Sequence, residues 1–102
     1  MSSPERARKI VLSPRARQDF IDILRFTGER WGQGQLHVYR DKINDALQFL
    51  DRNPAMGQSS PDLPDTHRLY FLGSHVVVYR DQESAIAVVR ILHQRMSLGL
   101  HC

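Results

Sequence analysis

Three side chains in this sequence could do chemistry on a phosphodiester: Arg68, Arg90 and His93. Cleavage of RNA by attack of its 2′-hydroxyl needs a group that takes the hydroxyl proton, a cation for the charge that develops on the phosphate, and an acid for the leaving oxygen. The arginines could supply the cation, and the histidine could exchange a proton. Arginine also pairs with carboxylates or phosphates of a bound partner, so a catalytic and a binding role are both open.

Arg90 lies in an apolar, β-branched run over residues 84–96, which predicts a central strand covered on both faces. Because side chains alternate along a strand, we expect Arg90 to share a face with Val88 and Leu92, and His93 to lie on the opposite face. One face of the strand must then hold a cation among aliphatic side chains.

A buried, unpaired guanidinium is too costly to expect. Arg90 should therefore pair with a carboxylate of its own chain or open into a groove that a partner fills. Asp62 and Asp65, in a loop predicted over residues 54–66, are the candidate carboxylates.

The length of 102 residues and the mass of 11.8 kDa predict one domain over residues 1–102, with a single core and no room for a separate catalytic module. The formal net charge is +3, and arginine supplies twelve of the fourteen basic residues. An acidic protein partner and a nucleic acid are both compatible with this excess of arginine.

The composition argues against several classes of protein. Cys102 is the lone cysteine, and the histidines lack the spacing of metal ligands, so we expect no disulfide, no metal and no cofactor. No apolar run reaches the roughly 18 residues of a membrane span, and the first nine residues lack the apolar core of a signal peptide. A cytoplasmic protein without membrane contact is the expectation.

Two consecutive helices are predicted to position these residues. Ser13-Pro14 is a typical helix start, and an apolar stripe that includes Trp31 continues to Gly32, which should end the first helix. We expect Trp31 to lie in the core. A second helix is predicted from about Gln35 to Arg52, roughly antiparallel to the first because the turn between them is short.

Four strands complete the prediction, over residues 9–12, 67–72, 75–80 and within 84–96, with a hairpin turn at Gly73-Ser74. Residues 1–8 should fray, and residues 97–102 should form a short tail.

The predicted fold is α+β, with the order β-α-α-β-β-β and an antiparallel helical hairpin packed on one face of a mostly antiparallel sheet. No element is left to cover the other face, and an uncovered face that is apolar and rich in arginine is best explained by a bound partner. The candidate partner-binding residues are Arg68, Tyr70, Val76, Val78, Arg80, Val88 and Arg90, with Arg95 and Met96 at the end of the last strand.

Four segments of the chain carry a resemblance to a known family. They are Leu-Ser-Pro-Arg-Ala-Arg-Gln-Asp-Phe-Ile-Asp-Ile over residues 12–23, Trp31-Gly32, Asn-Pro-Ala-Met-Gly over residues 53–57, and Val78-Tyr-Arg80 followed by Val-Arg-Ile-Leu-His-Gln-Arg-Met over residues 89–96. In their order and spacing the sequence resembles the ParE branch of the RelE/ParE toxins of type II toxin–antitoxin systems.

The resemblance implies a small bacterial toxin with this same fold, which causes growth arrest, serves plasmid or chromosome stabilisation and is held inactive by a ParD-like antitoxin. Toxins of the ParE type poison DNA gyrase, and those of the RelE type cut mRNA on the ribosome. RelE-like enzymes use lysines, arginines and a tyrosine, whereas some relatives use a glutamate, an arginine and a histidine.

Neither catalytic set is complete in this sequence. Lys9 and Lys42 fall at the start of the first strand and inside the second helix, and no glutamate lies between residues 29 and 83, so Asp62 or Asp65 would have to act as the base. We therefore predict a non-enzymatic gyrase inhibitor in a hetero-oligomer with its antitoxin, without specific DNA binding of its own. The alternatives are a ribosome-dependent mRNA endonuclease that uses Arg68, Arg90 and His93, and a detoxified binding or regulatory module.

Overall fold

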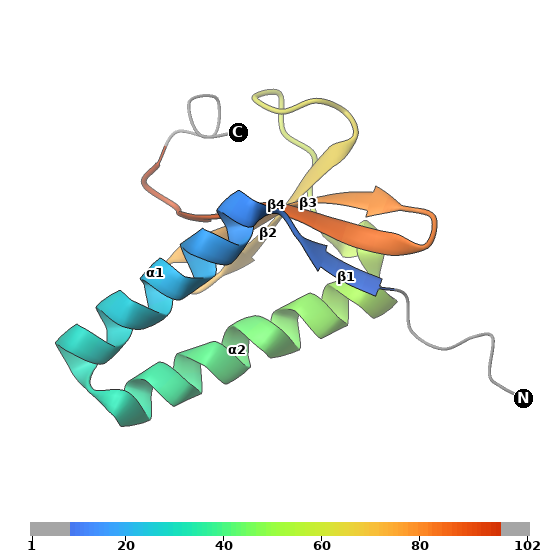
Figure 1. Ribbon diagram of the computed structural model, residues 1–102. Helices are drawn as coiled ribbons and strands as arrows, with labels where there is room; N and C mark the ends of the chain where they lie inside the picture. Colours follow the sequence, from blue (N-terminus) through green and yellow to red (C-terminus); the bar gives the residue numbers. More distant parts are fainter. Residues whose placement is uncertain (1–8, 97–102) are drawn as a thin grey trace, which may run out of the picture.

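A computed structural model describes residues 9–96 and confirms the α+β fold with the order β-α-α-β-β-β. The expectations for residues 1–8 and 97–102 fall outside the described residues. The two long helices lie side by side on one face of the sheet (Figure 1). The elements are β1 (Lys9–Leu12), α1 (Pro14–Trp31), α2 (Gln33–Arg52), the short 3₁₀ helix η1 (Pro54–Met56), β2 (His67–Leu72), β3 (His75–Gln82) and β4 (Ala85–His93).

The ends of α1 follow from local sequence. Ser13 Oγ accepts a hydrogen bond from the Ala16 amide at 2.9 Å, and Pro14 occupies the first turn, where an amide would have no partner within the helix. Gly32 ends the helix with a φ of +93°, a conformation that residues with a Cβ rarely adopt. Because α2 begins at Gln33, slightly before the predicted start, a single residue joins the two helices.

The sheet has the strand order β1-β4-β3-β2. β2, β3 and β4 form antiparallel pairs, and β1 pairs in parallel with β4, so the sheet is mostly antiparallel, as predicted. β4 lies between two strands, which explains why apolar residues occur at both parities of its sequence.

A β-bulge in β4 changes the predicted alternation of its side chains. Val78 pairs with Arg90 and Tyr79 pairs with Val88, so Val89 has no residue opposite it. Ser13 Oγ donates to the Val89 carbonyl at 2.8 Å and so links the start of α1 to the bulge. The prediction that Arg90 and Val88 share a face is wrong, because the extra residue shifts the alternation by one position.

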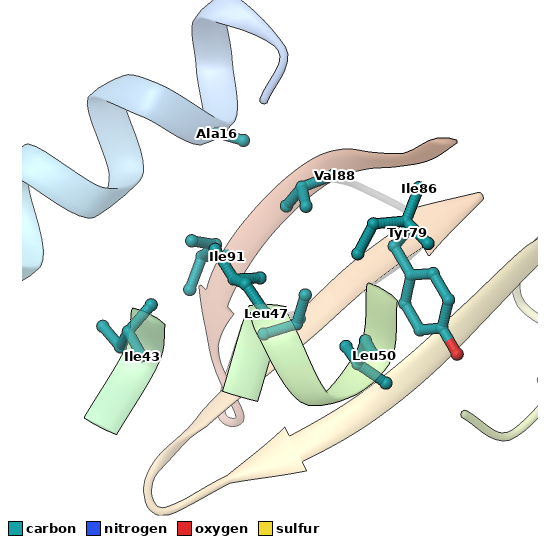
Figure 2. Close-up of a cluster of buried hydrophobic side chains, with 9 residues drawn as sticks. Ala16, Ile43, Leu47, Leu50, Tyr79, Ile86, Val88 and Ile91 are labelled. Atoms are coloured by element: carbon teal, nitrogen blue, oxygen red, sulfur yellow. The ribbon is translucent and has the colours of Figure 1, made fainter. Parts of the chain in front are cut away.

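The main core lies between the helical hairpin and the sheet (Figure 2). Ile43, Leu47 and Leu50 of α2 contribute to it together with Ala16 of α1. The sheet supplies apolar residues from both sides of the bulge, namely Val77, Tyr79, Ile86, Val88 and Ile91. This apolar contact fixes the helical hairpin to the sheet.

The opposite face of the sheet carries a second buried cluster, and the prediction that this face is open is wrong. Leu63, from the segment between η1 and β2, packs there against buried side chains of the sheet, namely Leu69, Val76, Val78 and Leu92. The predicted loop was therefore correct in position, but it covers a face that we expected a partner to cover.

The outer edge of β2 is also occupied. The amide and the carbonyl of Leu69 both bond to Gln58, each at 2.8 Å, and the His67 amide donates to the Pro64 carbonyl at 3.0 Å. At His67 and Leu69, three of the backbone groups that an added strand would need are thus already paired.

Within residues 9–96, no helix combines the length and the apolar character that a transmembrane segment requires.

Candidate functional site

Arg90 is buried and pairs with a carboxylate that the sequence analysis did not consider. Its Nε and Nη2 donate to the two carboxylate oxygens of Asp19 in α1, at 2.8 and 3.0 Å. The Ile91 amide also donates to Asp19, at 2.9 Å. The predicted choice of Asp62 or Asp65 is therefore wrong, because β4 lies beside the first turns of α1, where β1 has already ended.

Arg68 has a structural contact of its own. Its Nη1 donates to the Gly57 carbonyl at 2.9 Å, while the Gly57 amide donates to Tyr79 Oη at 2.9 Å. Tyr79 Oη in turn donates to the Pro54 carbonyl at 2.6 Å. These bonds hold the segment after α2 against the sheet.

The three candidate catalytic residues do not converge. Arg68 lies opposite Tyr79, and His93 lies opposite His75, which is four residues away along β3 or about 13 Å at about 3.3 Å per residue. Arg90 is held by Asp19 elsewhere. Among these described side chains, the acid–base set required for RNA cleavage is not assembled around one point.

Four of the nine predicted partner-binding residues are buried, namely Val76, Val78, Val88 and Arg90. Val76 and Val78 belong to the cluster beneath Leu63, and Val88 lies in the core beneath the helices. Tyr70 is half-buried, with its ring 5.8 Å from that of Phe49. These residues were expected on an exposed surface, and that expectation is wrong because they divide between two covered faces.

The remaining candidates at the surface are Arg80, Arg95 and Met96. Met96 lines a groove of about 560 Å³ between the helical hairpin and the β2–β3 turn. The helical connection projects beyond the strands in Figure 1. The apolar and aromatic part of its lining comes from Ile23, Phe26, Trp31, Tyr39, Ile91 and Met96. Its polar part comes from Asp19, Asp22, Thr27, Gln35, Ser74, His75 and His93.

Trp31 and Phe26 are the most exposed large side chains of the groove, with 66% and 60% of their surface accessible. The predicted core position of Trp31 is wrong, because α1 extends past the sheet before it reaches this residue. The Arg30 guanidinium lies 5.6 Å from the Trp31 ring centroid and 6.0 Å from that of Phe26. This end of the hairpin combines aromatic surface with a positive charge.

The polar end of the groove contains a cluster that sequence reasoning missed. His75 and His93 are directly paired across β3 and β4, with ring centroids 5.4 Å apart. Tyr39 Oη of α2 lies 2.6 Å from His75 Nδ1. The available signal was the hairpin register, since His75 directly follows the predicted turn and His93 ends the last strand.

Burial and charge both affect the titration of this cluster. Burial lowers the pKa of His75, and the nearby charge of His93 when protonated lowers it further. Burial raises the pKa of the Tyr39 phenol. At neutral pH His75 and Tyr39 are therefore uncharged hydrogen-bonding groups beside an apolar surface.

Within residues 9–96, the structure shows no group of three or more His, Cys, Asp or Glu side chains arranged to hold a metal ion. The groove is instead suited to binding an amphipathic segment, with aromatic surface along its length and hydrogen-bonding groups at one end.

Comparisons with known proteins agree with this fold. The family model described as ParE toxin of type II toxin-antitoxin system, parDE, matches residues 10–98. Toxin ParE1 of Caulobacter vibrioides is 34% identical over 90 residues, which cover 88% of this chain and 93% of the relative. Toxin ParE1 of Mycobacterium tuberculosis is 34% identical over 91 residues, with the same two coverages.

A solved structure described as the chromosomal ParDE TA system from P. aeruginosa has the same fold, with a TM-score of 0.72 and 16% identity. The match covers 85% of this chain and 96% of that chain. The family model and the two relatives span most of the sequence, and together they show that this chain belongs to the ParE toxin family of type II toxin–antitoxin systems.

Proposed function

We propose that this toxin acts by binding, with DNA gyrase as its target, and that a ParD-like antitoxin neutralises it by occupying the groove between the helical hairpin and the β2–β3 turn. The proposal for gyrase follows from the resemblance to ParE-type toxins. The proposal for the groove follows from its exposed aromatic residues, which have no cover within the described chain.

The observation that carries the binding mechanism is the engagement of both candidate catalytic arginines. Arg90 donates to Asp19, and Arg68 donates to the Gly57 carbonyl. To stabilise a phosphate in a cleavage reaction with its Nε and Nη2, Arg90 would have to give up the ion pair that holds α1 on β4. A mechanism that leaves these contacts intact is favoured.

The exposed aromatic residues of the groove favour a helical antitoxin segment, and the pairing at Leu69 disfavours an added strand at β2. In the first half of β2, the Leu69 amide and carbonyl are paired with Gln58 and the His67 amide with Pro64, which hinders an incoming strand there. An amphipathic helix needs only an apolar groove and acquires its affinity from side chains. The net charge of +3 favours an acidic segment.

Two purified assays separate the proposed target from the enzymatic alternative. We expect the toxin to inhibit supercoiling by gyrase and to leave ribosome-bound mRNA intact. Cleaved mRNA with normal supercoiling would establish the endonuclease instead. Absence of both effects, together with normal growth of cells that express the chain, would favour a detoxified module.

Coexpression with the neighbouring reading frame tests the antitoxin partner. We expect a small acidic protein to copurify with the toxin and to restore supercoiling in the gyrase assay. Substitution of Trp31 in the groove should weaken this complex, whereas an unchanged complex would place the antitoxin on another surface.

A further inference from the structure

His75 and His93 lie at one end of the groove and present the same kind of atom to it. The Nδ1 of His93 accepts a hydrogen bond from the Arg95 amide at 3.2 Å, so the neutral ring carries its proton on Nε2. The Nδ1 of His75 lies 2.6 Å from Tyr39 Oη. A phenol is a better donor than a neutral imidazole, so Tyr39 donates and His75 also carries its proton on Nε2.

The two Nε2 atoms are accessible. Among the described residues, the one buried side-chain N or O atom without a hydrogen-bond partner is Asp51 Oδ1, in α2. Neither histidine Nε2 is therefore enclosed without a partner, and both rings line the groove. The groove thus offers two adjacent N–H donors, both from rings whose other nitrogen is already occupied.

We propose that His75 and His93 form a recognition site for a carboxylate. An acidic residue of the docked antitoxin segment supplies this carboxylate, and apolar residues of the same segment flank the acidic residue. The inference rests on the proposed docking of the antitoxin in the groove. A carboxylate has two oxygens and can accept from both donors at once, which a neutral amide oxygen does less strongly.

The charged groups around the pair are compatible with an incoming carboxylate. From α1, Asp19 is neutralised by Arg90, and Asp22 lies 3.6 Å from Arg25. From α2, the Lys42 ammonium lies 5.8 Å from the Tyr39 ring centroid, close to the pair. The segment after β4 adds the cation of Arg95.

Binding of a carboxylate at His75 and His93 should change the number of protons that the toxin holds. Burial lowers the pKa of His75 in the free toxin, so the neutral ring predominates at pH 6.5. A carboxylate within hydrogen-bond distance favours the protonated ring and raises the pKa again. Binding should therefore take up a proton from the solution.

Calorimetric titration of the toxin with the antitoxin encoded beside it, at pH 6.5 in phosphate and in Tris, measures this uptake. The two buffers differ in ionisation enthalpy, so the difference in observed heat gives the number of protons transferred. We expect about half to one proton taken up per toxin. His75→Gln and His93→Gln should each weaken binding by about tenfold to a hundredfold, and the double variant should lose the proton uptake.

Two further variants separate recognition from structure. His37→Gln changes an exposed histidine of α2 outside the groove and should alter neither affinity nor proton uptake. Tyr39→Phe removes the hydroxyl that orients His75 and should reduce the proton uptake while the core remains folded. If His75→Gln does not fold, His93→Gln provides the same measurement.

The outcomes distinguish the inference from the proposed function. Tight binding by the unmodified toxin without proton uptake overturns the carboxylate site alone. The same conclusion follows if the double variant binds with unchanged affinity. Absence of binding by the unmodified toxin overturns the proposed docking and this inference together. Replacement of the acidic residues of the antitoxin by their amides, one at a time, should reproduce the loss of proton uptake at one position.

Discussion

Asp19 and Arg90 lie 71 positions apart in the sequence and form a bidentate ion pair in which both side chains are largely buried. The same carboxylate accepts the Ile91 amide, so α1 is joined to both the side chain and the backbone of β4. Arg90 belongs to one of the four segments that carry the resemblance to the toxin family. Its role in the described structure is to fix the helical hairpin on the sheet.

Loss of Asp19 is predicted to be strongly destabilising. Asp19→Ala removes the carboxylate that pairs with the buried Arg90 guanidinium, which costs about 3–5 kcal/mol of unfolding free energy. Asp22→Ala, one turn along the same helix, removes an exposed pair with Arg25 and should cost about 0–1 kcal/mol. Urea denaturation of both variants measures the difference, and equal losses would mean that the buried pair adds no stability.

Ser13 is predicted to stabilise the fold through two hydrogen bonds of one hydroxyl. It accepts from the Ala16 amide and donates to the Val89 carbonyl. Ser13→Ala should cost about 1–3 kcal/mol, Ser13→Thr should retain most of the stability, and Ser13→Asp should recover only part of it because a carboxylate cannot donate to Val89. Equal stability of the Asp and Thr variants would show that the bond to Val89 contributes nothing.

The contact between Gly57 and Tyr79 is predicted to tolerate substitution of either residue poorly. Tyr79→Phe removes a buried hydroxyl that both accepts and donates, at a cost of about 1–3 kcal/mol. Gly57→Ala should also destabilise, because its Cβ would overlap Tyr79 Oη and lie 2.9 Å from Arg68 Cβ. Tyr70→Phe is the control and should change stability by less than about 0.5 kcal/mol. Wild-type melting temperatures for the first two variants would contradict the contact.

The stability of the toxin should fall on acidification through about pH 6.5. Burial lowers the pKa of His75 and of His67 in the folded chain, and for His67 the charge of Arg80 adds to the effect. The unfolded chain therefore takes up protons first as the pH falls, so the contribution of these residues is complete above pH 6.5 and is lost below it. His75→Gln should reduce the loss measured between pH 7.5 and 5, whereas His37→Gln should retain all of it.

The exposed aromatic residues of the groove are predicted to matter for binding and not for folding. Trp31→Ala and Phe26→Ala should each weaken antitoxin binding by about 2 kcal/mol or more and leave the melting temperature nearly unchanged. Phe71→Ala is a matched control, since Phe71 is also exposed but lies on β2 outside the groove. An equal loss in all three variants would argue against a specific site.

Sequence reasoning succeeded where local signals determine the structure. Ser13, Pro14 and Gly32 define the ends of α1 through hydrogen bonding and backbone conformation, and Gly73-Ser74 defines the β2–β3 turn. These signals act over a few residues, so the order of elements and the helical hairpin followed from the sequence.

Long-range contacts limited the prediction of the site. The bulge at Val89 is stabilised by Ser13, 76 positions away, and its effect on the alternation of β4 cannot be derived from β4 alone. Arg90 pairs with Asp19, and not with Asp62 or Asp65, because β1 ends before Arg90 and the first turns of α1 then lie beside β4. The His75–His93 pair depends on a strand register that the sequence did not fix.

The pairing of β2 with Gln58 and Pro64 also affects how free toxin molecules meet one another. A bare outer strand can recruit the same strand from a second molecule and extend into a fibril, but β2 is already paired at Leu69 and at the His67 amide. At the opposite edge, β1 has four residues and is a short template. Self-association of the free chain should therefore proceed through the aromatic groove and produce discrete oligomers, without continuous growth of β-structure.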